Sequence, residues 1–208
     1  MRDLLAEFIG TFALILVGAG SVVLNAGLVG IALAHGLVIF TMGTSFGKTS
    51  GGHFNPVVTL AVFIAGKINR QKAVEYVIVQ LLGAAVAGLV LLYLFGNVAS
   101  LGTPALGSEV DFTKGIFVEA ILTFFLVTVI LNTAVYDNAL LAPLAIGLTL
   151  TLDILFGGPL TGAAMNPARA FGPAIASGNW ANQLVYWIGP IIGSIVAFLT
   201  SKYINKTE

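Results

Sequence analysis

The sequence predicts an all-α integral membrane protein: a bundle of six transmembrane helices plus two re-entrant half-helices, arranged as an inverted repeat. Three observations support this fold class. The 208 residues are 58% hydrophobic and only 9% charged, which is too little charge to cover the surface of a soluble domain. Six apolar stretches are long enough to cross a bilayer. Four sequence markers recur in the second half of the chain at a nearly constant offset.

The six spans follow from length and polarity. A helix that crosses a bilayer needs about 20 mostly apolar residues, and the stretches that qualify are roughly 4–24, 29–47, 72–95, 113–135, 140–157 and 182–203. The first resembles a secretory signal, but Glu7 interrupts it and its apolar character continues to about Leu24. We therefore interpret it as a retained first helix.

Two shorter apolar pieces, about 56–66 and 167–177, cannot cross. They follow the dipeptides Asn55-Pro56 in "SGGHFNPVVT" and Asn166-Pro167 in "GAAMNPARAF". Asn caps a helix well, and Pro is tolerated at the first helical position because its missing N–H costs nothing there. Non-helical backbone at membrane depth survives only inside protein or along a watery cavity. We expect two half-helices that enter from opposite sides and meet at the midplane.

The markers show that the two halves resemble each other. "AEFIGTF" (6–12) recurs as "VEAILTF" (118–124), "HGL" (35–37) as "IGL" (146–148), and "YVIVQLLGA" (76–84) as "YWIGPIIGS" (186–194). Together with the two Asn-Pro pairs they indicate a duplication. Each unit has three spans, an odd number, so the second unit must enter from the opposite side. We expect a single domain over 1–208, with repeat 1 at about 1–100 and repeat 2 at about 110–205.

The basic residues predict the orientation. With a cytoplasmic N-terminus, Lys114 and Arg169 lie toward the outside. The other basic residues lie on or near the inner side: Arg2, Lys48, Lys67, Arg70, Lys72, Lys202 and Lys206. This excess fits the positive-inside rule. We expect a multi-pass protein of the cell membrane with both termini in the cytoplasm.

The converging half-helix starts predict a channel for neutral molecules. Unsatisfied N–H groups, two positive dipole ends and the amides of Asn55 and Asn166 would meet at one place. Such a place favours a neutral guest that accepts hydrogen bonds, and it repels cations. A net charge of zero without a basic run argues against nucleic acid as a partner. The chain has no Cys, only two His and no catalytic carboxylate pair, so we expect no metal, no cofactor and no enzyme activity.

The sequence resembles the aquaporins of the major intrinsic protein family over nearly its full length. The resemblance is carried by "SGGHFNP", "MNPARAFGP" and "YWIGPIIG", with Glu7 and Glu119 in the first and fourth spans. The family repeats Asn-Pro-Ala twice. Here the second motif is Asn166-Pro167-Ala168, but the first is Asn55-Pro56-Val57. We expect the donor geometry to survive, and the larger Val57 to affect how the half-helix starts pack.

The resemblance also implies a selectivity filter of four residues, His35, Ile154, Ala163 and Arg169. A buried Arg is costly and usually functional; here it would repel cations and replace hydrogen bonds that water gives up. The plain alternatives are a packing role for Arg169 and a satisfied core histidine for His35. The set is similar to filters of the plant vacuolar-membrane type, which also pass ammonia, and His53 is similar to a residue that lines the inner vestibule.

The resemblance implies a passive water channel, with single-file conduction that excludes protons and ions. It also implies a homotetramer in the lipid bilayer, with one pore per subunit, and ammonia or other small neutral solutes as further guests. A glycerol facilitator of the same fold is one alternative, although Ala170 and Ala174 differ from that branch. A coupled transporter is another, if Glu7 and Glu119 relay protons; the plain alternative is that they accept hydrogen bonds from backbone N–H groups. A membrane protein with a closed pore is the third.

Two further features of the sequence concern the packing of the helices and their surroundings. Asp153 directly precedes Ile154, and it faces either the outer vestibule or a neighbouring subunit. Small residues at four-residue spacing predict close helix contacts; they are Gly43/Gly47, Gly83/Ala87 and Gly189/Gly193.

Overall fold

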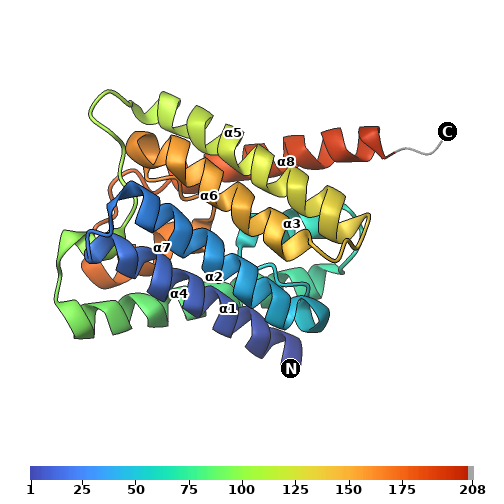
Figure 1. Cartoon of the computed structure of the whole chain (residues 1–208), viewed down its shortest axis with the longest axis horizontal. Coiled ribbons are helices and arrows are strands. Elements are labelled where there is room, and N and C mark those ends of the chain that lie inside the picture. Colours follow the sequence, from blue (N-terminus) through green and yellow to red (C-terminus); the bar gives the residue numbers. More distant parts are fainter. Residues whose placement is uncertain (206–208) are drawn as a thin grey trace.

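The computed structural model describes residues 1–205 as a helical bundle (Figure 1). The elements in chain order are α1 (Arg2–Val23), α2 (Gly27–Ser50), α3 (Pro56–Ile64), α4 (Arg70–Phe95), η1 (Ala99–Gly102), α5 (Phe112–Ile130), η2 (Leu131–Val135), α6 (Ala142–Thr161), α7 (Pro167–Ser177) and α8 (Val185–Ile204). Six of them, α1, α2, α4, α5 with η2, α6 and α8, are long and apolar enough to span a membrane. The predicted all-α fold class is confirmed.

Two spans differ from the prediction, one in where it ends and the other in its helix type. The fifth was expected at 140–157, but α6 runs from Ala142 to Thr161 and includes Pro159. It ends where Gly162 adopts a left-handed conformation with φ 79°, so a glycine cap rather than the proline decides the end. The fourth span reaches Val135 as predicted, but its last turn is a π-helix. Lys206, assigned to the inner side, lies outside the described residues.

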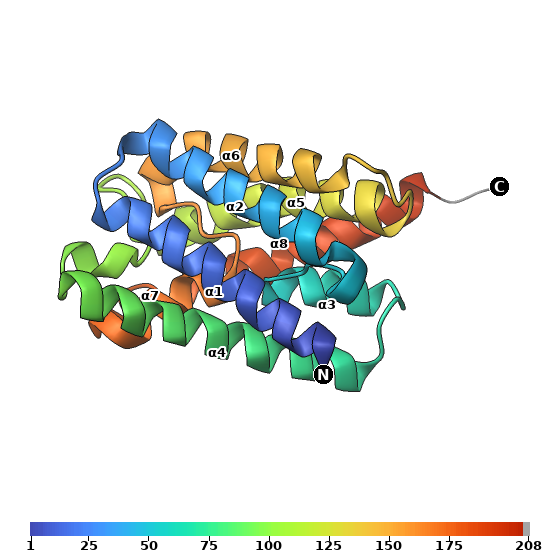
Figure 2. The ribbon, with the colours of Figure 1, turned by 60° about the horizontal axis from the view of Figure 1, so that its bottom comes forward.

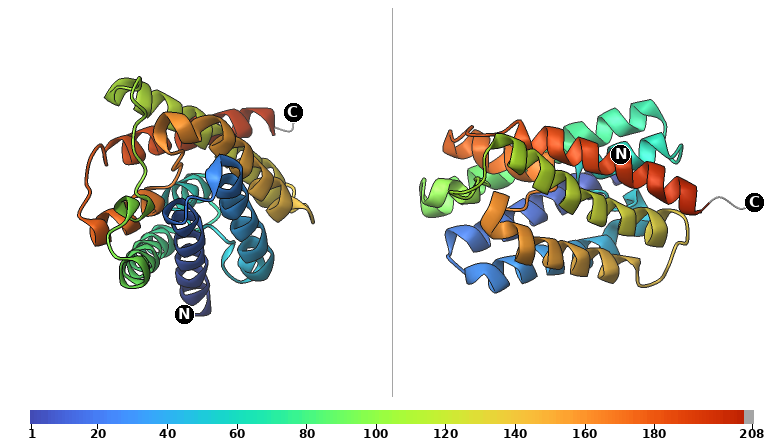
Figure 3. Two further views of the ribbon diagram at one scale, coloured as in Figure 1. Left: turned by 60° about the vertical axis from the view of Figure 1, so that its left-hand side comes forward. Right: turned by 90° about the horizontal axis from the view of Figure 1, so that it is seen from above.

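The two half-helices lie at opposite ends of the bundle (Figures 1 and 2). Helix α3 lies near the start of α1, whereas α7 lies at the far end, near the end of α4. The start of α1 and the end of α8 lie toward the same end of the bundle (Figures 1 and 3). This arrangement brings the first residues of α3 and α7 toward the middle of the molecule.

Close helix contacts depend on glycine at particular seams. Helix α1 packs on α4, and α5 packs on α8. A Cβ on Gly83 would lie 2.6 Å from the carbonyl oxygen of Phe8, and one on Gly189 would lie 2.7 Å from that of Ile116. Only glycine permits such an approach. The expectation for Gly47 is wrong, because a Cβ there would meet nothing within 4 Å among residues 1–205.

Candidate functional site: a central cavity where the half-helices meet

Two irregular segments lead into the half-helices. Each begins at a left-handed glycine that ends the preceding helix, Gly51 (φ 93°) after α2 and Gly162 (φ 79°) after α6. The residue before each capping asparagine also has a positive φ, 49° at Phe54 and 51° at Met165. A non-glycine residue loses about 1–2 kcal/mol in this conformation. Contacts from elsewhere must therefore hold both segments.

A buried carboxylate on α1 holds the first segment. Glu7 accepts hydrogen bonds from the backbone N–H groups of His53 at 2.9 Å and Phe54 at 2.7 Å. The hydroxyl of Ser50 and the side-chain amide of Gln80 also donate to it, at 2.7 and 2.8 Å. One side chain on a transmembrane helix thus fixes the backbone that precedes α3.

Glu119 on α5 does the same for the second segment. It accepts from the backbone N–H groups of Ala164 at 2.9 Å and Met165 at 2.7 Å, and from the hydroxyl of Thr161 at 2.7 Å. The two halves therefore share one pattern of two backbone donors and one hydroxyl donor around a carboxylate. Both carboxylates are fully buried.

The two asparagines cap their half-helices with their side-chain oxygens. Asn55 Oδ1 accepts from the N–H of Val57 at 3.0 Å. Asn166 Oδ1 accepts from the N–H groups of Ala168 at 2.9 Å and Arg169 at 3.3 Å. The oxygens are committed to backbone N–H groups of their own helices, as expected of an N-cap.

The amide nitrogens cross to the opposite half. Asn55 Nδ2 donates to the carbonyl oxygen of Met165 at 2.9 Å, and Asn166 Nδ2 donates to that of Phe54 at 3.0 Å. An amide nitrogen has two N–H groups, so each asparagine keeps one further donor. The reciprocal bonds also fix the two half-helix starts against each other.

Both asparagines lie on the wall of a cavity of about 730 Å³. The same cavity is lined by Lys48 and Lys67, near the C-terminal ends of α2 and α3, and by Arg169 on α7. It therefore extends from one end of the bundle past the asparagine pair. Within residues 1–205, no group of three or more metal-binding side chains is placed to hold an ion.

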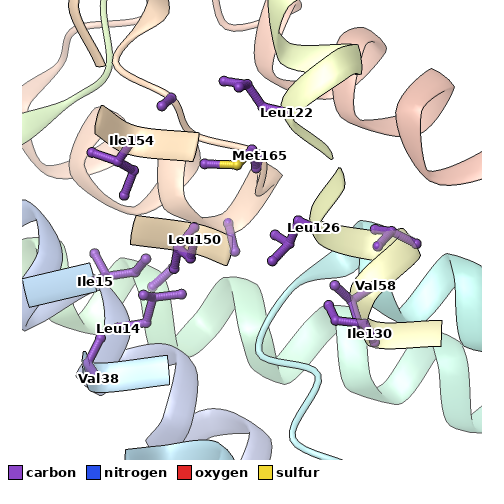
Figure 4. Close-up of a cluster of buried hydrophobic side chains, with 14 of the residues drawn as sticks. Leu14, Ile15, Val38, Val58, Leu122, Leu126, Ile130, Leu150, Ile154 and Met165 are labelled. Carbon is purple, nitrogen blue, oxygen red and sulfur yellow. The ribbon is translucent and has the colours of Figure 1, made fainter. Parts of the chain in front are cut away.

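The rest of the wall is largely apolar. Figure 4 shows Leu14, Val58, Leu126, Ile130 and Leu150, which come from α1, α3, α5 and α6 and all line the cavity. These side chains cannot form hydrogen bonds with a polar molecule in the cavity. The donors at the half-helix starts are therefore the main polar partners in the middle of the cavity.

Arg169 and His35 meet at the cavity wall. Arg169 is 3% exposed, and its Nε donates to His35 Nε2 at 3.1 Å. Its Nη1 has no hydrogen-bond partner, and no carboxylate among the described residues forms an ion pair with it. A buried cation with an unused donor thus lies beside the cavity.

The other two residues of the expected filter are buried side chains. Ile154 and Ala163 are 2% and 3% exposed and belong to the apolar cluster that also contains Met165. Ile154 and Met165 are labelled in Figure 4. Neither lines the cavity. The structure therefore brings His35 and Arg169 together on the wall of this cavity, whereas Ile154 and Ala163 are buried and are not part of its lining.

The sequence analysis did not predict a chain of polar side chains that leads from α4 to the cavity wall. Gln80 Nε2 donates to Thr59 Oγ1 at 3.0 Å, and Thr59 Oγ1 lies 3.0 Å from Nδ1 of His53. His53 lines the cavity. A polar Gln within an apolar span was the available signal, and it would have pointed to a buried partner.

A tyrosine pair was also missed. The Tyr76 hydroxyl donates to the carbonyl oxygen of Ser50 at 2.9 Å, and Tyr186 donates to that of Thr161 at 2.8 Å. These tyrosines open the repeated "YVIVQLLGA" and "YWIGPIIGS" segments, so the repeat itself carried the signal. They satisfy the carbonyl groups at the two helix ends.

Val57 and Asp153 have defined environments. Val57 is 2% exposed, and its backbone carbonyl accepts from the hydroxyl of Ser194 on α8 at 2.7 Å, so the larger side chain is buried while the half-helix start stays bound to α8. Asp153 is 6% exposed, does not line the cavity, and its Oδ2 has no partner among the described residues. It lies neither on the cavity wall nor on the exposed surface.

Comparisons with known proteins agree with this architecture. The probable aquaporin TIP3-2 of Arabidopsis thaliana is 40% identical over 98% of this chain and 83% of its own length. Aquaporin TIP4-4 of Zea mays is 41% identical over 96% of this chain and 84% of its own length. The X-ray structure of the aquaglyceroporin from Plasmodium falciparum is similar with a TM-score of 0.85, at 26% identity, over 98% of this chain and 96% of that one.

The family model described as major intrinsic protein matches residues 1–200, which include both half-helices and the cavity between them. Sequence relatives with aquaporin names cover nearly all of the chain. The chain therefore belongs to the major intrinsic protein family.

Proposed function

We propose that this member of the family is a passive water channel that conducts in single file and excludes protons and ions. The observation that carries the proposal is the donor-only asparagine pair. Both side-chain oxygens are bound by backbone N–H groups, of Val57 at 3.0 Å and of Ala168 at 2.9 Å. The pair can therefore offer only N–H groups to a guest in the cavity.

Donors alone orient water. A water molecule between Asn55 and Asn166 accepts with its oxygen and turns its hydrogens toward its neighbours on either side. The neighbouring waters are then oriented in opposite directions, which interrupts the hydrogen-bond chain along which a proton would move. The positive ends of α3 and α7 add a barrier to cations at the same place.

Arg169 supplies the second barrier. Because it is buried and lacks an ion-pair partner among the described residues, its charge is not neutralised locally. Arg169 also lines the cavity, so we propose that its guanidinium donates hydrogen bonds to water that has lost others on entering the pore. We also propose the filter role predicted for His35, Ile154, Ala163 and Arg169. His35 and Arg169 line the cavity, and Ile154 and Ala163 would act beyond its lining. We propose ammonia as a further solute.

Glu7 and Glu119 are best explained as structural groups. They accept hydrogen bonds from backbone N–H groups, from hydroxyls and, at Glu7, from the Gln80 amide. This pattern is that of a group that holds the backbone in place, and not that of a proton relay. We also propose a homotetramer in the lipid bilayer of the cell membrane, with cytoplasmic termini. The division into repeats at about 1–100 and 110–205 stays a prediction.

Glycerol conduction is the second candidate, because a structure similar to this one is that of an aquaglyceroporin. Vesicles containing the purified protein test both candidates. Light scattering after an osmotic shift gives the permeability to water, glycerol and methylammonium, with empty vesicles as the control. We expect water permeability well above the control and glycerol permeability close to it.

Several results would change the proposal. Glycerol permeability as high as that of water would make the protein a glycerol facilitator. Saturable uptake that depends on a proton gradient and disappears in Glu7→Gln would favour a coupled transporter. Water permeability equal to that of empty vesicles would favour a closed pore.

A further inference from the structure

The His35 ring is held on two sides by hydrogen bonds that also fix its tautomer. Its Nδ1 lies 2.8 Å from the carbonyl oxygen of Ile31, and a carbonyl can only accept, so Nδ1 carries the proton. The neutral ring then has an unprotonated Nε2, which accepts from Arg169 Nε at 3.1 Å. The ring position and the Arg169 position are therefore coupled.

A third side of the ring faces a glycine on α1. A Cβ built on Gly18 would overlap the His35 ring at Nε2, Cδ2 and Cε1. These atoms form the far edge of the ring, and Nε2 is the atom that binds Arg169. The ring consequently cannot yield to a side chain at position 18 without disturbing its bond to Arg169.

The repeat provides an internal comparison. The residues that correspond to Gly18 and His35 at offsets of 112 and 111 are Ile130 and Ile146, and both line the cavity. The second half of the chain therefore has apolar side chains where the first half has a glycine and an imidazole. A glycine at this position therefore occurs in the repeat that carries the imidazole. The fold itself does not require a glycine there, because the second repeat has Ile130.

We propose that Gly18 is a specificity-determining positioning residue: its missing side chain leaves the space in which the His35 ring lies beside Arg169. This inference rests on the proposed channel function. Protein interiors are densely packed, and the open volume that the ring touches is the cavity it lines. A methyl group at position 18 therefore moves the ring into the cavity and narrows it.

The test is a double-mutant cycle in vesicles, with permeability measured per folded protein. Gly18→Ala should lower the methylammonium-to-water permeability ratio by at least about threefold, a change that a small rise in one barrier produces. If the wild type excludes methylammonium, the same fall is expected in water permeability. Gly20→Ala is the matched control on the same helix, because its nearest neighbour would be Leu91 Cδ2 at 3.3 Å; it should leave both values unchanged.

The second arm of the cycle separates a positioning role from a packing role. In a His35→Ala background the ring is gone, so adding Gly18→Ala should change neither permeability. A Gly18→Ala effect of equal size in that background would overturn the inference, because the methyl group would then act without His35. If Gly18→Ala alone fails to fold, the inference requires that the double variant folds; failure of both would overturn it.

The inference and the proposed function fail in different ways. A wild type that conducts water and a Gly18→Ala variant with unchanged permeabilities refute the inference alone. A wild type no more permeable than empty vesicles refutes the channel proposal, and the inference with it.

Discussion

The hydrogen bonds between Glu119 and the backbone before α7 allow a quantitative prediction about the stability of the fold. Replacing Glu119 by Leu removes the acceptor for the backbone N–H groups of Ala164 and Met165, now bound at 2.9 and 2.7 Å. Two buried donors without partners cost about 1–3 kcal/mol each. The Thr161 hydroxyl can rotate toward another acceptor, so we assign it no cost. Glu119→Leu should therefore lose about 2–6 kcal/mol of folding free energy, the sum of the two donor terms.

A conservative variant refines this expectation. The two N–H groups bind different oxygens of the carboxylate, Ala164 at Oε1 and Met165 at Oε2. A Gln at position 119 keeps one acceptor oxygen and replaces the other by an NH₂ donor. Glu119→Gln should therefore lose about half as much stability, because a single buried donor is left without a partner.

Thermal unfolding in detergent is the measurement. For a chain of this size, 1 kcal/mol corresponds to about 2–4 °C in Tm, so Glu119→Leu should melt at least about 4 °C below the wild type. The Tm of Glu119→Gln should lie between those of the wild type and Glu119→Leu. Water permeability should fall with Glu119→Leu because the segment that positions Asn166 is released. A Glu119→Leu protein with the Tm and permeability of the wild type would refute the claim that Glu119 holds the backbone before α7.

Three other variants test the filter and the packing. Arg169→Val removes the buried cation and should admit glycerol or small cations in the vesicle assay; unchanged selectivity would remove Arg169 from the filter. His35→Phe should narrow the pore and reduce methylammonium flux before water flux, whereas an equal loss of both would contradict a discriminating role. Gly147→Ala should lower Tm in detergent, because its Cβ would lie 2.5 Å from the carbonyl oxygen of Gly36 and overpacking costs about 1–3 kcal/mol. Gly47→Ala is the matched control, since a Cβ there would meet nothing within 4 Å; equal Tm values for the two variants would contradict the packing argument.

The sequence was sufficient for the features that depend on local chemistry and on repetition. Hydropathy predicts the six spans because a bilayer imposes length and polarity on every crossing segment. The two Asn-Pro pairs predict the starts of α3 and α7, because cap and first-turn preferences act within a few residues. Where the prediction missed, as at the end of α6, a glycine cap decided the boundary in place of Pro159.

Only the tertiary structure decided which groups remain free. The Asn55 and Asn166 nitrogens bind carbonyl groups 110 and 112 residues away, and no local pattern specifies such partners. The same is true of Gly18, whose sequence context gives no sign of the His35 ring that fills its space. A sequence records which donors and acceptors a chain possesses, whereas packing at long range determines which of them are already used.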